Sequence, residues 1–102
     1  MERKRVLIAI NHPNEIEKFK ELLISYGYEV KIVDNGISAL KLSSEFKPHI
    51  ILCELYLTKV DGHHLLKEIK SQSSTRLIPF ILMSRHRSVN ERVHSINLGV
   101  DD

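Results

Sequence analysis

Short apolar runs alternate with longer amphipathic segments along the chain, and this alternation constrains the fold more than any other feature. The apolar runs at 6–10, 49–55 and 77–83, and the alternating segment at 28–33, have the length and residue types of strands. The segments between and after them carry apolar residues at helical spacing. Four strand–helix repeats predict one α/β domain with a parallel sheet and right-handed crossovers.

Individual residues indicate where the helices begin and end. Pro13 suits a first helical turn, with Asn11 or His12 in the capping position, and we expect Asn11 to act as a helix cap rather than as a ligand. Pro48 ends the second helix, because the residue before a proline avoids the α region. Asp61 has the character of an N-cap for the third helix.

The composition narrows the class of protein. With 102 residues, 42% of them hydrophobic, the chain is long enough for one packed domain. A net charge of +2 and two short basic clusters without interleaved aromatic residues do not favour direct nucleic-acid binding. The apolar run at 6–10 is too short for a signal peptide, and no run approaches the ~18 residues of a membrane span. We therefore expect a cytoplasmic protein without a membrane partner.

A parallel sheet places its functional crevice beyond the carboxyl ends of its strands. This rule directs attention to residues 10–12, 34–35, 54–60 and 84–87. Cys53 is the single cysteine, so an internal disulfide is excluded, and its place inside an apolar run predicts an inert core thiol.

The chain resembles the receiver domain of two-component response regulators over nearly its whole length. The similarity lies in the order and spacing of several stretches. These are Arg5-Val6-Leu7-Ile8-Ala9, Tyr26-Gly27-Tyr28-Glu29-Val30, Asp34-Asn35-Gly36 with Ala39-Leu40, Pro48-His49-Ile50-Ile51-Leu52-Cys53-Glu54-Leu55, Val60-Asp61-Gly62, Ile78-Pro79-Phe80-Ile81-Leu82-Met83-Ser84 and Leu98-Gly99-Val100-Asp101-Asp102. The resemblance implies a flavodoxin-like (CheY-like) fold with strand order 2-1-3-4-5. The fifth strand and helix of that fold are absent from this chain, so we expect residues 1–102 to form a single, C-terminally incomplete receiver-like domain.

The resemblance also assigns roles to positions. Active receivers are phosphorylated on an aspartate that ends strand three, an acidic pair after strand one helps to bind Mg²⁺, and a hydroxyl residue and a lysine follow strands four and five. Here Glu54 occupies the phosphoacceptor position, Ile10 and Asn11 occupy the acidic-pair positions, and Ser84 keeps the hydroxyl. The lysine position lies beyond Asp102.

These replacements argue against a metal site. Mg²⁺ takes hard oxygen ligands, usually carboxylates with waters and phosphate. Ile10 offers no ligand and Asn11 offers only a neutral amide oxygen. His12 and Glu54 together would hold a softer metal only weakly. We therefore expect neither a metal nor another cofactor.

Glu54 leaves three interpretations open. Its carboxylate reaches roughly 1.5 Å further than that of aspartate, and a misplacement of about 1 Å can slow an in-line attack on the order of 100-fold. The residue therefore either imitates a phosphorylated aspartate, or is a solvated or salt-bridged carboxylate in an inactive site, or is still phosphorylated. Arg85, and Lys59 as second choice, are candidates to pair with Glu54 and fill the pocket, together with His12. The alternative for Arg85 is a solvated basic loop.

The expected function is a non-enzymatic signalling module, a pseudo-receiver that binds a protein partner or an output domain without phosphorylation. The rival is a phosphorelay receiver that is phosphorylated in a Mg²⁺-dependent way at or near Glu54. A four-stranded remainder exposes the edge of strand four and an apolar stripe on the first helix. That exposure predicts either a longer protein or a homodimer through the strand-four edge.

Overall fold

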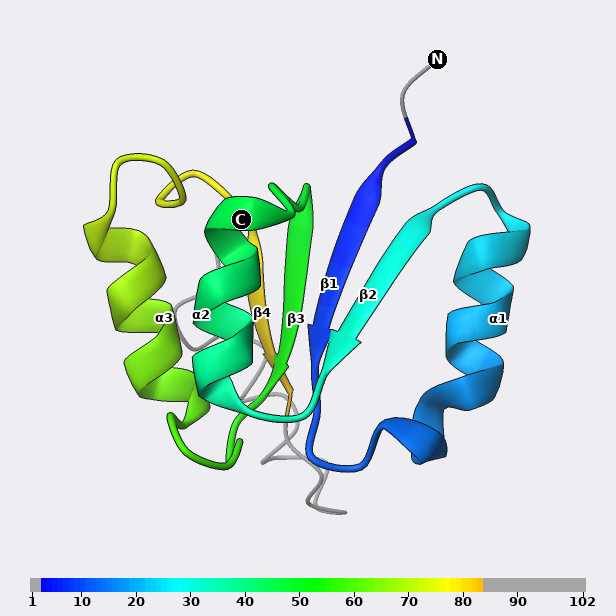
Figure 1. The fold of residues 1–102 in the computed structure, drawn as a ribbon, viewed down its shortest axis with the longest axis horizontal. Coiled ribbons are helices and arrows are strands. Elements are labelled where there is room, and N and C mark those ends of the chain that lie inside the picture. Colours follow the sequence, from blue (N-terminus) through cyan, green and yellow to red (C-terminus); the bar gives the residue numbers. More distant parts are fainter. Residues whose placement is uncertain (1–2, 84–102) are drawn as a thin grey trace.

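The computed structural model describes residues 3–83, and these form a parallel sheet with helices on both faces (Figure 1). The strands are β1 (Arg5–Ala9), β2 (Glu29–Val33), β3 (Ile50–Glu54) and β4 (Phe80–Met83). Their order is β2-β1-β3-β4, and each neighbouring pair is parallel. The predicted fold class and strand order are confirmed.

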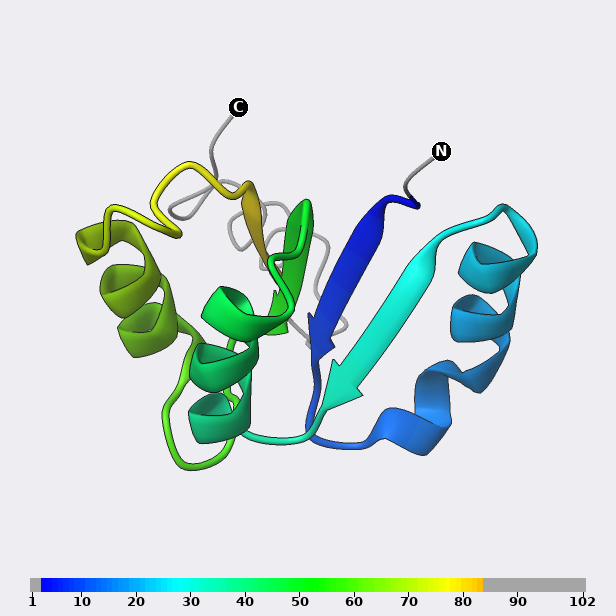
Figure 2. The same cartoon turned by 45° about the horizontal axis from the view of Figure 1, so that its top comes forward.

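Helices cover the two faces of the sheet unequally. A 3₁₀ helix η1 (Pro13–Ile16) leads into α1 (Glu17–Ser25), which lies on one face. The helices α2 (Gly36–Glu45) and α3 (Gly62–Ser71) lie side by side on the other face (Figure 2). Two covered faces explain why β1 and β3 are apolar at successive positions, whereas the edge strand β2 alternates charged and apolar residues.

The larger core lies between the sheet and the α2–α3 pair. Its strand residues are completely buried and are Leu7, Ala9, Ile51, Cys53, Phe80 and Leu82. From the helices, Ala39, Leu65 and Ile69 pack against them. The smaller core, around Val6, Ile8 and Ile10, packs against α1 and η1.

The helix α1 covers its face only in part. Its apolar residues recur at helical spacing, yet Leu22 is 50% exposed, and Tyr26, the residue that directly follows the helix, is 74% exposed. From η1 and α1, Ile16 and Leu23 pack against the smaller core. The expected apolar stripe on the first helix is therefore exposed.

One expected boundary was wrong. The strand expected at 77–83 begins at Phe80, because Pro79 lacks an N–H and the amide of Ile78 donates to the carbonyl of Thr75 in a turn. The first helix begins with a 3₁₀ turn at Pro13 and has His12 in the N-cap position, which is one of the two expected alternatives. The helix expected after the strand at 77–83 lies outside the described residues. Within residues 3–83, no helix has both the length and the apolar character needed to cross a membrane.

Candidate functional site

The site lies at the carboxyl edge of the sheet, where three loops meet. The loops that follow β1, β2 and β3 lie together beyond the arrowheads of these strands (Figure 1). Parallel strands bring their carboxyl ends to one edge, so residues far apart in sequence become neighbours there.

Glu54 is the last residue of β3, and its side chain is buried, with 4% exposure. The backbone N–H of Asn11 donates a hydrogen bond to Glu54 Oε1 at 2.8 Å. A buried carboxylate is costly unless hydrogen-bond donors face it. Glu54 is therefore a hydrogen-bonded, buried group, and the interpretation of a solvated carboxylate was wrong.

The side chain of Asn11 holds the loop after β3 against the end of β1. Its Nδ2 donates to the carbonyl oxygen of Tyr56 at 2.8 Å, and its Oδ1 accepts from the N–H of Thr58 at 2.9 Å. The expectation that Asn11 caps a helix was wrong, because His12 is the N-cap of η1 and makes no capping hydrogen bond with its side chain. An amide carries a donor and an acceptor, and the loop presents a partner for each.

Thr58 extends this network to the loop after β2. Its Oγ1 donates to the carbonyl oxygen of Asp34 at 3.0 Å, and its own carbonyl oxygen accepts from the N–H of Gly36 at 3.0 Å. Asn35 caps α2 by accepting from the N–H of Ser38. The sequence placed Thr58 in the crevice range but gave no sign that it joins two loops.

The described side chains at this edge of the sheet do not offer the ligands that Mg²⁺ takes. Ile10 presents a buried apolar side chain, and both polar side-chain atoms of Asn11 are engaged by the loop. Of positions 10, 11 and 54, Glu54 alone carries a carboxylate, whereas Mg²⁺ takes several hard oxygen ligands. Across residues 3–83, no three His, Cys, Asp or Glu side chains are grouped so that they could hold a metal ion.

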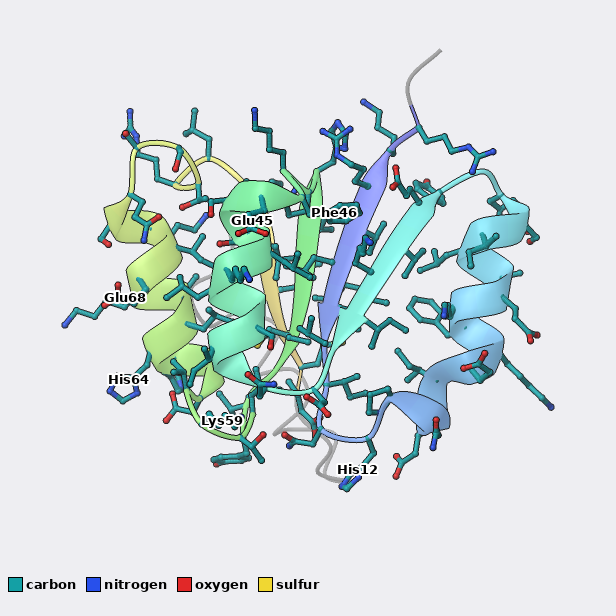
Figure 3. The ribbon with its side chains drawn as sticks, viewed as in Figure 1. His12, Glu45, Phe46, Lys59, His64 and Glu68 are labelled. Atoms are coloured by element: carbon teal, nitrogen blue, oxygen red, sulfur yellow. The ribbon has the colours of Figure 1, made fainter. Side chains whose placement is uncertain are left out.

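The other candidate residues lie elsewhere. Lys59 lines a groove of about 500 Å³ with Asp61, His64 and Glu68, beside α3 (Figure 3). His12 is exposed at the start of η1. Ser84 and Arg85 lie outside the described residues, so the pairing of Arg85 with Glu54 stays a prediction.

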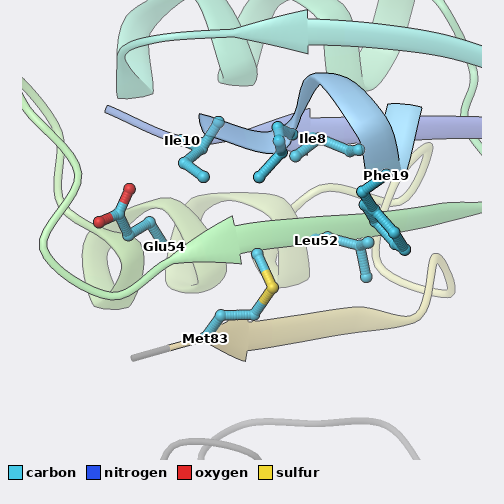
Figure 4. Close-up of a pocket in the computed structure, with 7 residues that line it drawn as sticks. Ile8, Ile10, Phe19, Leu52, Glu54 and Met83 are labelled. Atoms are coloured by element: carbon cyan, nitrogen blue, oxygen red, sulfur yellow. The ribbon is translucent and has the colours of Figure 1, made fainter. Parts of the chain in front are cut away.

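An apolar pocket of about 370 Å³ adjoins Glu54 on the α1 side of the sheet. Glu54 and Ile10 lie at one end of it, and Phe19 and Leu52 lie at the other (Figure 4). Ile8, Ile16 and Met83 complete the lining from the described residues. The buried carboxylate thus separates a polar loop network from an apolar cavity.

Asp61 is the N-cap of α3, as the sequence predicted. Its Oδ1 accepts from the backbone N–H of His64 and lies 3.0 Å from His64 Nδ1. The hydrogen bond from the His64 backbone, followed by that from its side chain, holds the pKa of Asp61 below its ordinary value of 3.8.

Because the folded pKa is the lower one, Asp61 contributes stability above pH 3.8 that is lost as the pH falls through its folded pKa. Asp61→Ala should therefore lower the free energy of unfolding by about 1 kcal/mol at neutral pH. Urea unfolding at neutral and at acidic pH measures this, with the exposed Glu68→Ala in the same helix as the control. An equal deficit at both pH values would contradict the role of the charged cap.

The sequence matches a known family over most of its length. The profile of the response regulator receiver domain covers residues 6–102. The chain belongs to the response regulator receiver family. A signal receiver domain of a histidine kinase from Syntrophus aciditrophicus is 30% identical, with a TM-score of 0.78 over 97% of this chain and 75% of that one.

Other similar proteins are longer than this chain. The receiver domain of a sensor histidine kinase from Pseudomonas aeruginosa, solved with a magnesium ion coordinated in its active-site cleft, has a TM-score of 0.77 at 24% identity, over 92% of this chain and 80% of that one. The probable transcriptional regulator ycf27 of Galdieria sulphuraria is 29% identical over 100% of this chain, and ZraR of Klebsiella oxytoca is 29% identical over 99%. The receiver described here spans 39% and 22% of the lengths of these two regulators.

Proposed function

We propose that this receiver transmits its signal through protein contacts, without enzymatic activity and without phosphorylation of Glu54. The coarser role, a receiver domain of two-component signalling, follows from its family. The observation that carries the proposal is the hydrogen bond from the Asn11 backbone to a buried Glu54 carboxylate, at positions where active relatives keep acidic residues.

Phosphoryl transfer needs positive charge near the transferred group, which metal ions usually supply. In this chain Ile10 provides no ligand, and the Asn11 amide is committed to Tyr56 and Thr58. The magnesium ion in the Pseudomonas receiver belongs to that protein, and for this chain we propose neither Mg²⁺ nor another cofactor. Glu54 then serves as a fixed negative charge at the end of β3.

Protein contacts are the expected output of such a module. The relatives named as transcriptional regulators are much longer, which supports a partner or an attached output domain. Four large apolar side chains are exposed on or directly after α1, a feature typical of interaction surfaces. They are Phe19, Leu22, Ile24 and Tyr26. Neither nucleic acid nor a membrane is a proposed direct partner, and the proposed location is the cytoplasm.

A homodimer through β4 is the alternative to a different partner. Among the described strands β4 pairs only with β3 and thus forms one edge of the sheet. An unpaired edge favours pairing with a further strand. Light scattering after gel filtration distinguishes a dimer from a monomer that awaits another protein.

Incubation with acetyl phosphate and MgCl₂, followed by intact-mass measurement, tests the proposed function. We expect no phosphoryl adduct, because the site lacks the ligands that would bring a cation to Glu54. The matched control is the triple variant Ile10→Asp, Asn11→Asp and Glu54→Asp, which restores the acidic residues at all three positions.

A phosphoryl adduct on Glu54 of the unaltered protein would overturn the proposal and favour the phosphorelay receiver. An adduct on the triple variant alone would support it. Such an adduct is an acyl phosphate, formed when the carboxylate oxygen attacks phosphorus and acetate leaves.

A further inference from the structure

Three donor or acceptor groups of Asn11 reach three residues that lie 43 to 47 positions further along the chain. Its backbone N–H donates to Glu54, its Nδ2 donates to the carbonyl of Tyr56, and its Oδ1 accepts from the N–H of Thr58. The three distances lie between 2.8 and 2.9 Å. One residue therefore ties the end of β1 to the end of β3 and to the loop after it.

Two of these partners are oxygen acceptors of the kind that bind hard cations. A carboxylate oxygen and a backbone carbonyl oxygen are both ordinary ligands of divalent metal ions. Here N–H groups of Asn11 occupy these acceptors instead. The backbone N–H of Asn11 thus supplies partial positive charge to Glu54, and its side-chain amide supplies it to Tyr56, where a cation would otherwise bridge the two oxygens.

We propose that Asn11 is a positioning residue that replaces a bound cation, holding the loop at 56–58 in one arrangement that does not respond to divalent metals. This inference rests on the proposed function and concerns the regulation of the same site. The contacts of Asn11 with Glu54, Tyr56 and Thr58 carry it.

The arrangement held by Asn11 includes the loop after β2. Thr58 bonds the carbonyl of Asp34 and the N–H of Gly36, so the tether of Asn11 also positions the beginning of α2. Tyr56, which is 66% exposed, follows β3 in the same loop. A partner that contacts this edge therefore meets a surface that is already fixed.

The amide of Asn11, in place of a carboxylate, is what makes the loop arrangement independent of metal. Asn11→Asp keeps the size of the side chain and the acceptor for Thr58, but it places a carboxylate oxygen against the carbonyl oxygen of Tyr56. Oxygens that face one another repel unless a cation lies between them. The variant should therefore gain the metal dependence that the unaltered protein lacks.

Two measurements, each made with and without MgCl₂, test the inference. They are the hydrogen-exchange rate of the Thr58 backbone N–H, monitored by NMR, and the melting temperature of the protein. In the unaltered protein we expect the same Thr58 exchange rate and the same melting temperature in both conditions. Asn11→Ala should raise the exchange rate of Thr58 about tenfold, because it removes the acceptor of that amide, and MgCl₂ should not reverse the change.

Asn11→Asp should melt at a lower temperature than the unaltered protein without metal, and MgCl₂ should restore much of the loss. The control is Asn14→Asp, which adds the same charge at an exposed position of η1 and should show no metal dependence. The size-matched aspartate keeps the test informative if the alanine variant does not fold.

The inference is overturned if Asn11→Ala leaves the Thr58 exchange unchanged, or if Asn11→Asp melts identically with and without MgCl₂. These outcomes differ from failure of the proposed function, which requires a phosphoryl adduct on Glu54 of the unaltered protein. If the Asn11 variants contradict the inference but Glu54 of the unaltered protein gains no phosphoryl adduct, the proposed function through protein contacts still stands.

Discussion

Gly36→Ala is expected to destabilise the fold by about 3 kcal/mol, although alanine is the better helix former. Gly36 is the buried first residue of α2, and a Cβ built on it would overlap the carbonyl oxygen of Val60 and lie 2.5 Å from Val60 Cβ. The overlapped atom belongs to the backbone of the loop after β3, so it cannot turn aside as a flexible side chain does. Helix propensity alone predicts a gain of up to about 1 kcal/mol, of opposite sign.

Urea unfolding of Gly36→Ala and of the unaltered protein measures this difference. Ser44→Ala, at an exposed position in the same helix, is the control and should change the free energy of unfolding by less than about 0.5 kcal/mol. A Gly36→Ala protein as stable as the parent would mean that α2 and the loop after β3 do not approach as closely as described. The site network would then lack its support on the α2 side.

The layered fold could be predicted because its signal is local. A strand that is buried on both faces must be apolar at successive positions, and β1 and β3 show this in their own residues. The cap of α3 was equally visible, since Asp61 bonds an N–H three residues away. Features of this kind depend only on residues that are close together in the sequence.

The central contacts of the site could not be predicted, because their partners are remote in sequence. Asn11 stands before Pro13, and that spacing is typical of a cap, yet its partners Tyr56 and Thr58 come from another strand–loop unit. The burial of Glu54 was hidden in the same way. The resemblance gave its position at the end of a strand, but only the folded chain brings the Asn11 backbone to its carboxylate.

The periodicity of the sequence also does not reveal whether anything packs against the apolar face of a helix. The spacing of Phe19, Leu22 and Tyr26 marks one apolar face of the first helix. Periodicity identifies such a face but says nothing about what packs against it. In the structure all three side chains are exposed.

Cys53 is expected to react with iodoacetamide at least about 1000-fold more slowly in the folded protein than in urea. Its side chain is completely buried in β3, and burial, together with the negative charges of Glu54 and Asp61, raises the pKa of the thiol to about 12 from an ordinary 9.0. Because the thiolate is the reacting species, a rise of about three pKa units lowers its population at about pH 8 roughly 1000-fold. Steric burial slows the reaction further.

Intact-mass measurements during labelling at about pH 8, with and without urea, give the two rates. The control is Ser44→Cys, which places a second thiol at an exposed position and should be labelled at an ordinary rate without urea. Rapid labelling of Cys53 in the native protein would contradict the burial of β3 between the two helical layers. If labelling is slow, the reagent reaches Cys53 only when the sheet opens, so the labelling rate also measures how often the sheet opens. Gly36→Ala should therefore raise the labelling rate of Cys53, whereas Ser44→Ala should not.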